Sequence, residues 1–81
     1  MILKYIILKN KNTPVVFPRE PFSHYEIAKN LGDVKSAGFC IIRIKEEKLL
    51  IKCFGESSTL TIKSSPEEDR EIIKKFITNK Y

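Results

Sequence analysis

Residues 36–54 read SAGFCIIRIKEEKLLIKCF, and apolar residues alternate on both sides of the pair Glu46-Glu47. This pattern is typical of a β-hairpin that turns at the two glutamates. Folding there makes six cross-strand pairs: Phe39–Phe54, Cys40–Cys53, Ile41–Lys52, Ile42–Ile51, Arg43–Leu50 and Ile44–Leu49. One face of the hairpin is then continuously apolar. The opposite face is more apolar than a plain solvent face should be, so we expect another part of the protein to cover some of it.

The N-terminal residues predict a second hairpin. Ile2 to Leu8 is rich in β-branched and aromatic residues and is followed by the turn-prone sequence NKNT. Pairing Leu8 with Val15 also sets Ile6 opposite Phe17, which keeps the apolar groups on one face. Two prolines bound the returning strand, Pro14 and Pro18. Proline is tolerated mainly in edge strands, so we expect this strand at an edge of the sheet.

A short helix is expected to follow residue 23. Ser23 and Glu26 have the spacing of a capping box, and Phe22 and Ile27 have that of a hydrophobic staple. Gly32 suits the left-handed position that ends a helix. The three-and-four spacing predicts an inward stripe made of His24, Ile27, Ala28 and Leu31.

The C-terminal part predicts one more strand and a longer helix. Leu60 and Ile62 alternate with polar residues from Thr59 to Lys63, and Ser65-Pro66 then begins a helix with acids in its first turn. The apolar stripe of this helix is Ile72, Ile73, Phe76 and Ile77. The order ββαβββα predicts a single α+β domain over residues 1–81, with a small, mostly antiparallel sheet and the helices on one face.

Composition limits the classes of function. The chain has 81 residues and a net charge of +5, with ten acidic residues among fifteen basic ones. A domain of this size buries a modest core, so a homo-oligomer is expected. The apolar N-terminus is interrupted by Lys4 and Lys9 and is too short for a membrane span. Two cysteines without a signal peptide indicate a reducing, cytoplasmic environment, and their spacing matches neither a CxxC redox pair nor a zinc cluster. We expect no metal and no cofactor.

The best candidate site is a pair of hydroxyl-rich turns on either side of the predicted strand. Gly55 permits close backbone approach, Ser57, Ser58 and Thr59 offer hydroxyls, and Lys63 offers positive charge. The helix start after Ser64-Ser65 adds free N–H groups, which favour anions. Ser36 and Gly38 are expected to form the opposing wall. This corner would hold a small anionic ligand such as a nucleotide; the alternative is two ordinary turns that never meet.

The only histidine, His24, is expected either to donate to that ligand or to be a partly buried, locally bonded side chain. Catalysis would require it to reach Ser57, Ser58 or Cys53. No nucleophile elbow is present, because Thr59 stands where GxSxG needs its second glycine. We therefore expect no enzyme and no catalytic residues. Cys40 and Cys53 are interpreted as core residues, although their predicted pairing also permits a disulfide.

The segments HYEIAKNLG, SAGFC, CFGESSTL and SSPEEDREII resemble, in that order, short uncharacterised proteins encoded by phages and prophages. The resemblance implies an accessory protein that acts by binding, either inhibiting a host defence protein or sequestering a nucleotide signal. The alternative function is nucleic-acid binding, with Arg43, Lys52, Lys63 and the helix lysines on phosphates. Such binding would weaken steeply with salt.

Overall fold

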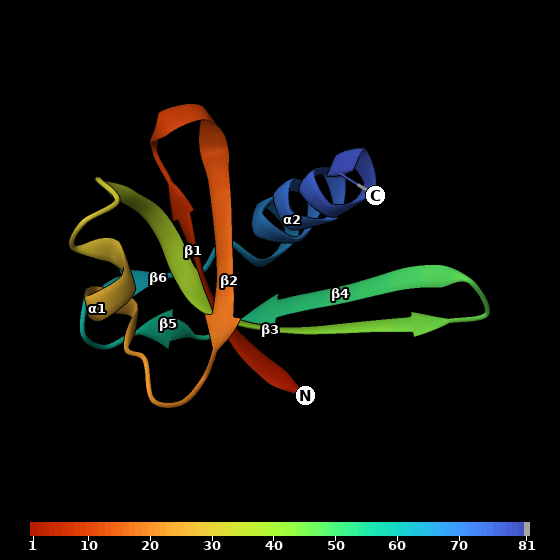
Figure 1. The fold of residues 1–81 in the computed structure, drawn as a ribbon, viewed down its shortest axis with the longest axis horizontal. Coiled ribbons are helices and arrows are strands. Elements are labelled where there is room, and N and C mark those ends of the chain that lie inside the picture. The colour runs from red at the N-terminus through yellow and green to blue at the C-terminus, as the bar shows by residue number, and fades with distance from the viewer. Residues whose placement is uncertain (81) are drawn as a thin grey trace.

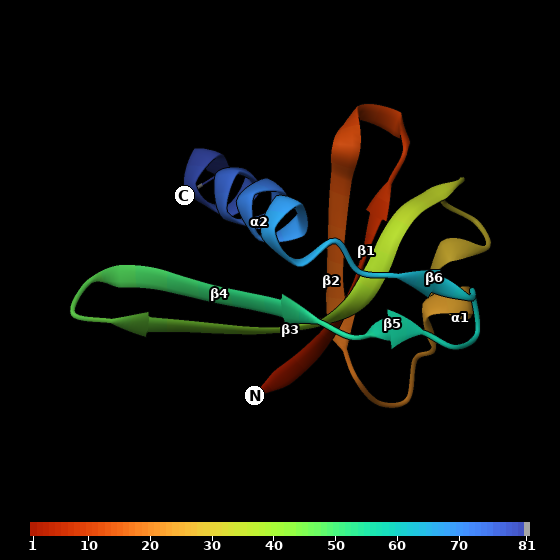
Figure 2. The same ribbon diagram turned by 180° about the vertical axis from the view of Figure 1, so that it is seen from behind.

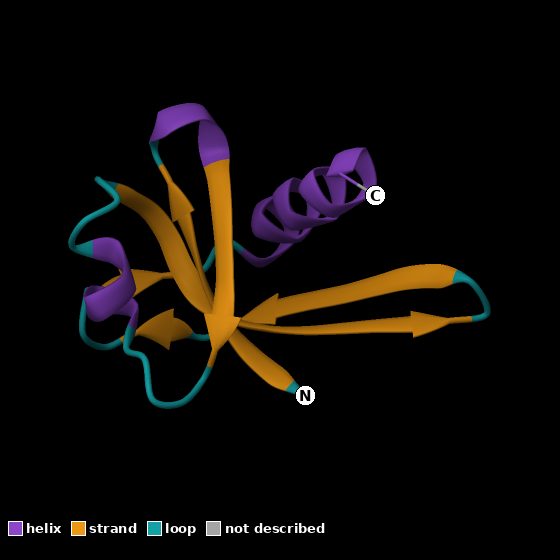
Figure 3. Ribbon diagram, viewed as in Figure 1, coloured by secondary structure: helices purple, strands orange, loops and turns teal. Residues whose placement is uncertain are grey.

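The computed structural model describes residues 1–80, and side chains as far as residue 79. The main sheet has four antiparallel strands in the order β2-β1-β3-β4, and a separate two-stranded hairpin joins β5 to β6 (Figure 1; Figure 3). The strands are β1 (Ile2–Leu8), β2 (Thr13–Pro18), β3 (Val34–Lys45), β4 (Lys48–Phe54), β5 (Glu56–Ser57) and β6 (Ile62–Lys63). The helices are η1 (Asn10–Asn12), α1 (His24–Ala28) and α2 (Pro66–Lys80). The predicted α+β class and mostly antiparallel sheet are confirmed.

The β3–β4 hairpin has the predicted register at every one of its six pairs, and Lys45–Lys48 closes it. Glu46 and Glu47 both have left-handed backbone, with φ of 52° and 64°. Two consecutive left-handed residues are the geometry of the type I′ turn, whose twist matches that of the strands. Since β1 pairs with β3 only as far as Ile41, residues 41–52 project from the body as a two-stranded ribbon, which we call the arm (Figure 1).

The β1–β2 hairpin forms, but the predicted register is wrong by two residues. Leu8 pairs with Thr13, and Ile6 pairs with Val15. The connection is tighter than expected because η1 folds it into one 3-10 turn, with Lys11 and Asn12 at φ of 59° and 49°. A shift by an even number keeps each side chain on its face, so the apolar pattern survives the change. The expected edge position of β2 is confirmed.

The two helices lie on opposite faces of the main sheet, and the expectation of one face is wrong (Figures 1 and 2). On the α2 face, Tyr5 and Ile7 of β1 pack in one cluster with Ile73 of the helix. On the α1 face, Ile6 packs with Ala28. The reason lies in β1, because consecutive apolar residues along a strand point to alternate faces and both faces then need a cover.

The first helix has its predicted start but ends early. The Ser23–Glu26 capping box is present in both directions. The helix ends at Ala28 with Lys29 as its C-cap, and Gly32, at φ of 119°, belongs to the loop that follows. Leu31 is therefore 48% exposed and not part of the inward stripe.

The strand expected over Thr59 to Lys63 is shortened to Ile62–Lys63, because the chain turns at residues 58–61. Thr61 has a φ of 55°, which ends regular strand geometry there. The last helix begins at Pro66 as predicted. Ile73 is fully buried, and Ile72 and Ile77 pack beside it. Among the helices described, none is long and apolar enough to cross a membrane.

Candidate functional site

The two hydroxyl-rich turns meet in space. Ser64 donates its backbone N–H and its hydroxyl to the Gly55 carbonyl oxygen, at 3.1 and 2.6 Å. The segments between them form the β5–β6 hairpin, in which Ser57 pairs with Ile62. The juxtaposition that the predicted anion site requires is thus present, and the alternative of two separate turns is wrong.

Several polar groups of this corner nevertheless bind other parts of the chain itself. Ser57 is fully buried, and its hydroxyl accepts a hydrogen bond from the Leu60 N–H at 3.1 Å and lies 3.3 Å from the Thr59 hydroxyl. Thr59 in turn accepts from the Tyr25 N–H at 3.3 Å. Ser58 and Lys63 are exposed. The hydroxyls of Ser57 and Thr59 therefore hold the β5–β6 hairpin together and tie it to α1.

The two glycines of the predicted site are required by packing. A Cβ on Gly38 would lie 2.5 Å from the Phe54 carbonyl oxygen and 3.1 Å from the Ser64 Cβ. Gly55 has a φ of 78°, and a Cβ there would lie 3.0 Å from the Phe39 ring. Both glycines thus lie close to other residues of the same chain. Those residues occupy the space beside the glycines in which a ligand was expected.

His24 is a core side chain on the α1 face. It is 3% exposed, and its ring meets those of Phe17 and Phe39 edge-on at 5.7 and 5.6 Å. Nε2 donates to the Gly38 carbonyl oxygen at 2.8 Å, so Nε2 carries the hydrogen. Burial lowers the pKa of His24 below its usual 6.5, which outweighs the opposite effect of the Gly38 bond. Within the described residues no hydrogen bond joins it to Ser57, Ser58 or Cys53.

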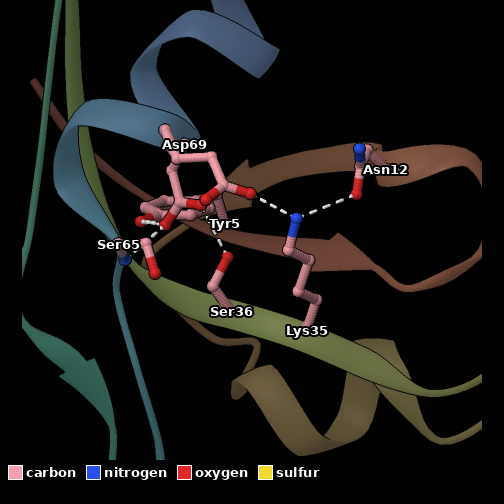
Figure 4. A network of polar contacts seen from close by, with 7 residues as sticks. Tyr5, Asn12, Lys35, Ser36, Ser65 and Asp69 are labelled. Carbon is pink, nitrogen blue, oxygen red and sulfur yellow. Dashed lines mark hydrogen bonds and ion pairs between the residues drawn. The ribbon is translucent and has the colours of Figure 1, made fainter.

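Ser36 does not line a wall of the corner, because it lies on the α2 face. Its hydroxyl donates to Asp69 at 2.6 Å (Figure 4). The same carboxylate accepts from the Tyr5 hydroxyl at 2.5 Å and from the Ser65 N–H at 2.8 Å. Asp69, Tyr5 and Ser36 are 0–1% exposed. This network joins the start of α2 to β1 and β3 and is closed to solvent.

Sequence reasoning missed the Asp69 network. Asp69 stands among the acids in the first turn of α2, and nothing local in the sequence marks it as buried. The available signal was the combination of a tyrosine in the middle of a strand, Tyr5, with an acid in the first turn of a helix, Asp69. A buried Tyr5 hydroxyl needs a partner, and burial and Asp69 together raise its pKa above the usual range.

Cys40 and Cys53 are directly opposed, buried and free. Burial raises the pKa of the Cys40 thiol to about 12 and that of Cys53 to about 11. Both thiols are therefore poor nucleophiles at neutral pH. Among the described residues, no group of His, Cys, Asp and Glu side chains has the arrangement of a metal site.

One face of the arm carries a cluster of positively charged side chains. Alternation places four cations on the continuation of the α1 face: Arg43, Lys45, Lys48 and Lys52. All four are exposed, and the ion pairs of the described residues, Lys35–Glu68 and Arg70–Glu71, involve none of them. Ile41 and Leu50 lie between them over a shallow depression of about 230 Å³. We call this surface the basic face. Lys63, expected to act with Arg43 and Lys52, lies on β6 instead.

Comparison of the chain with protein-family models, curated proteins and solved structures found no match.

Proposed function

We propose that this protein is a non-enzymatic binding protein that engages the phosphate backbone of double-stranded DNA through the basic face of the arm. The observation that carries the proposal is the set of four exposed cations on one side of a projecting two-stranded ribbon, with no acidic partner among the described ion pairs. Phosphate contacts from such cations supply most of non-specific DNA affinity. The proposal retains an accessory protein that acts by binding, as the resemblance to phage-encoded proteins implies.

The shape of the arm supports duplex DNA as the partner. A two-stranded β-ribbon fits the major groove of B-DNA, whereas the deep, narrow major groove of an RNA helix does not admit side chains. Ile41 and Leu50 lie among the cations and would face sugars or the methyl groups of thymine. The arm projects beyond the body of the protein, so the body does not block its approach (Figure 2).

Other classes of function are less well supported. The hydroxyls of Ser57, Thr59 and Ser64 and the two glycines of the predicted ligand corner make contacts within the chain. Tyr5, Ser36 and Asp69 are buried, so this polar cluster offers no surface on which a substrate reacts. The four cations of the basic face, by contrast, are exposed and take part in neither ion pair of the described residues.

The test is a fluorescence anisotropy titration of a labelled DNA duplex at several salt concentrations. The double variant Arg43→Gln with Lys52→Gln should bind more weakly, and the slope of log K against log salt should become shallower by about 2. The matched control is Lys9→Gln with Lys75→Gln, which removes the same charge from exposed residues outside the arm.

The control should leave the salt slope unchanged. Absence of binding to duplex DNA at low salt would refute the proposal, as would equal losses in the two double variants. Tighter binding to single strands or to RNA than to duplex DNA would also contradict it.

A further inference from the structure

The main sheet has one blocked edge and one open edge. The blocked edge is β2, which carries Pro14 and Pro18. The open edge is β4, which contains no proline and which pairs, among the described strands, with β3 alone. We propose that β4 pairs with β4 of a second copy of this chain, antiparallel about a two-fold axis that passes beside Ile51. The resulting dimer has one continuous eight-stranded sheet.

The turn determines which backbone groups face the open edge. In a hairpin with a two-residue turn, the flanking pair, here Lys45–Lys48, exchanges hydrogen bonds. Alternation from that pair directs the N–H and C=O groups of Leu49, Ile51 and Cys53 away from β3. The backbone hydrogen bonds of the described loops, turns and caps use none of these groups. Three consecutive outward positions form a regular template for another strand.

Charge selects one register of this pairing. With Ile51 opposite itself, all seven residues of β4 pair, and Lys52 lies opposite Leu50 of the second copy. A slip that places Leu50 opposite itself sets Lys48 against Lys52, and a slip in the other direction sets Lys52 against Lys52. Like charges directly opposite one another destabilise a sheet. Of these three registers, the one centred on Ile51 pairs the most residues, and it alone places no lysine opposite another lysine.

The helix beside the edge is complementary to itself under the same symmetry. Two grooves of about 140 and 210 Å³ separate β4 from α2. Glu67 lines the groove near Cys53, and Lys74 lines the groove near Leu49. Because the two-fold axis exchanges these ends, Glu67 of one copy faces Lys74 of the other. Arg70 lines both grooves, but it forms an ion pair with Glu71 of its own chain at 3.1 Å, which offsets its charge there. The match of Glu67 with Lys74 makes a second copy the occupant of the edge, in preference to an unrelated peptide.

The dimer goes beyond the proposed DNA binding and does not depend on it. An axis perpendicular to the sheet places both basic faces on the same side, so DNA would meet two adjoining ribbons. Dimer formation is measured without DNA, and therefore either proposal can fail alone.

The first test is sedimentation equilibrium of three variants beside the wild type. Leu50 is 43% exposed, so a single chain tolerates a polar residue there. Leu50→Lys would oppose Lys52 of the second copy twice per dimer and should weaken association roughly tenfold. Leu50→Glu would form two ion pairs at the same positions and should keep the dimer. The control Ile44→Lys changes a residue that is 75% exposed and lies away from the β4 edge, and it should have no effect.

The second test is cross-linking of a mixture of Leu50→Cys and Lys52→Cys chains under oxidation. Their α-carbons would be about 4.5 Å apart across the two-fold axis, as in a non-hydrogen-bonded pair, which permits a disulfide. Each variant alone should cross-link poorly, because the diagonal distance of about 7–8 Å is too long. A wild type that is monomeric at about 100 μM refutes the proposal. Equal weakening by Ile44→Lys, or no cross-link in the mixture, refutes it as well.

Discussion

At the scale of single residues, the polar groups inside this protein are held by short, specific hydrogen bonds. Asp69 is fully buried and belongs to neither described ion pair, yet it accepts from Tyr5, Ser36 and the Ser65 N–H. Three donors replace the water that a carboxylate loses on burial. His24 is satisfied in the same way by the Gly38 carbonyl oxygen. These residues stabilise the fold, although their chemistry resembles that of an active site.

The lowered pKa of His24 predicts acid sensitivity. The folded state binds a proton at His24 less readily than the unfolded state, whose pKa is near 6.5. The stabilising contribution of neutral His24 is therefore present above pH 6.5 and is lost as the pH falls below it. His24→Gln does not titrate there, and its amide can donate to the Gly38 carbonyl oxygen. The free energy of unfolding of the wild type and of His24→Gln is measured by urea titration at pH 8 and at pH 5. Between pH 8 and pH 5, the wild type should lose more stability than His24→Gln.

Ser23→Ala is the control, since it removes a cap from the same helix without removing a titrating group. It should cost about 1 kcal/mol at both pH values. A His24→Gln difference that is constant with pH would contradict the prediction.

At the scale of elements, the arm depends on a turn whose residues do not suit it. Type I′ turns favour Asn-Gly because both central residues have positive φ, and here Glu46 and Glu47 occupy those positions. The same two glutamates are the only acids on an otherwise basic ribbon tip. The hairpin keeps its register because the stabilisation from six cross-strand pairs exceeds the conformational cost of placing two glutamates at positive φ.

Replacing the turn should stabilise the protein. Glu46→Asn with Glu47→Gly supplies residues that adopt positive φ at low cost and should raise the free energy of unfolding by about 1 kcal/mol. Thermal or urea unfolding measures the change. Glu46→Gln with Glu47→Gln removes the same charges without easing the backbone, and it should leave stability nearly unchanged. Equal stabilisation by both pairs would show that charge, and not backbone geometry, is responsible.

At the scale of the whole molecule, one long strand joins two structural units. The first part of β3 pairs with β1 in the body, and its last part pairs with β4 in the arm. α2 lies in the angle between the β1–β2 hairpin and the arm (Figure 1), and Ile73 packs there against a cluster that includes both cysteines. The core on this face is thus closed by the C-terminal helix, and loss of that helix would expose it.

This arrangement predicts that the thiols react only when the core opens. Cys40 and Cys53 have pKa values of about 12 and about 11, above the ordinary 9.0, and both are covered. Their contribution to stability is present below pH 9 and is lost as the pH rises toward 11. At pH 8, iodoacetamide should label native protein very slowly. Ile73→Ala should speed labelling of both thiols together by about 100-fold, because loss of such a buried side chain costs about 3 kcal/mol.

An exposed thiol introduced by Ile44→Cys provides the reference rate for an accessible group. Rapid labelling of Cys53 in the native wild type, followed by mass spectrometry of peptides, would contradict the prediction.

The features that the sequence determined by itself are those that depend on neighbours along the chain. The turn at Glu46-Glu47 and the register of the arm follow from period-two alternation, and the start of α1 follows from the Ser23–Glu26 capping box. The α+β class follows from the order of these elements. The basic character of Arg43 and Lys52 was visible too, because alternation places them on one face.

What only the tertiary structure decided are the contacts between distant segments. Tyr5 and Asp69 are 64 positions apart, and no local pattern brings their oxygens together. The same holds for the meeting of Ser64 with Gly55, which fills the predicted ligand corner, and for the placement of the helices on opposite faces. Periodicity specifies which residues are buried but not which other segment buries them, since that choice depends on the packing of the whole chain.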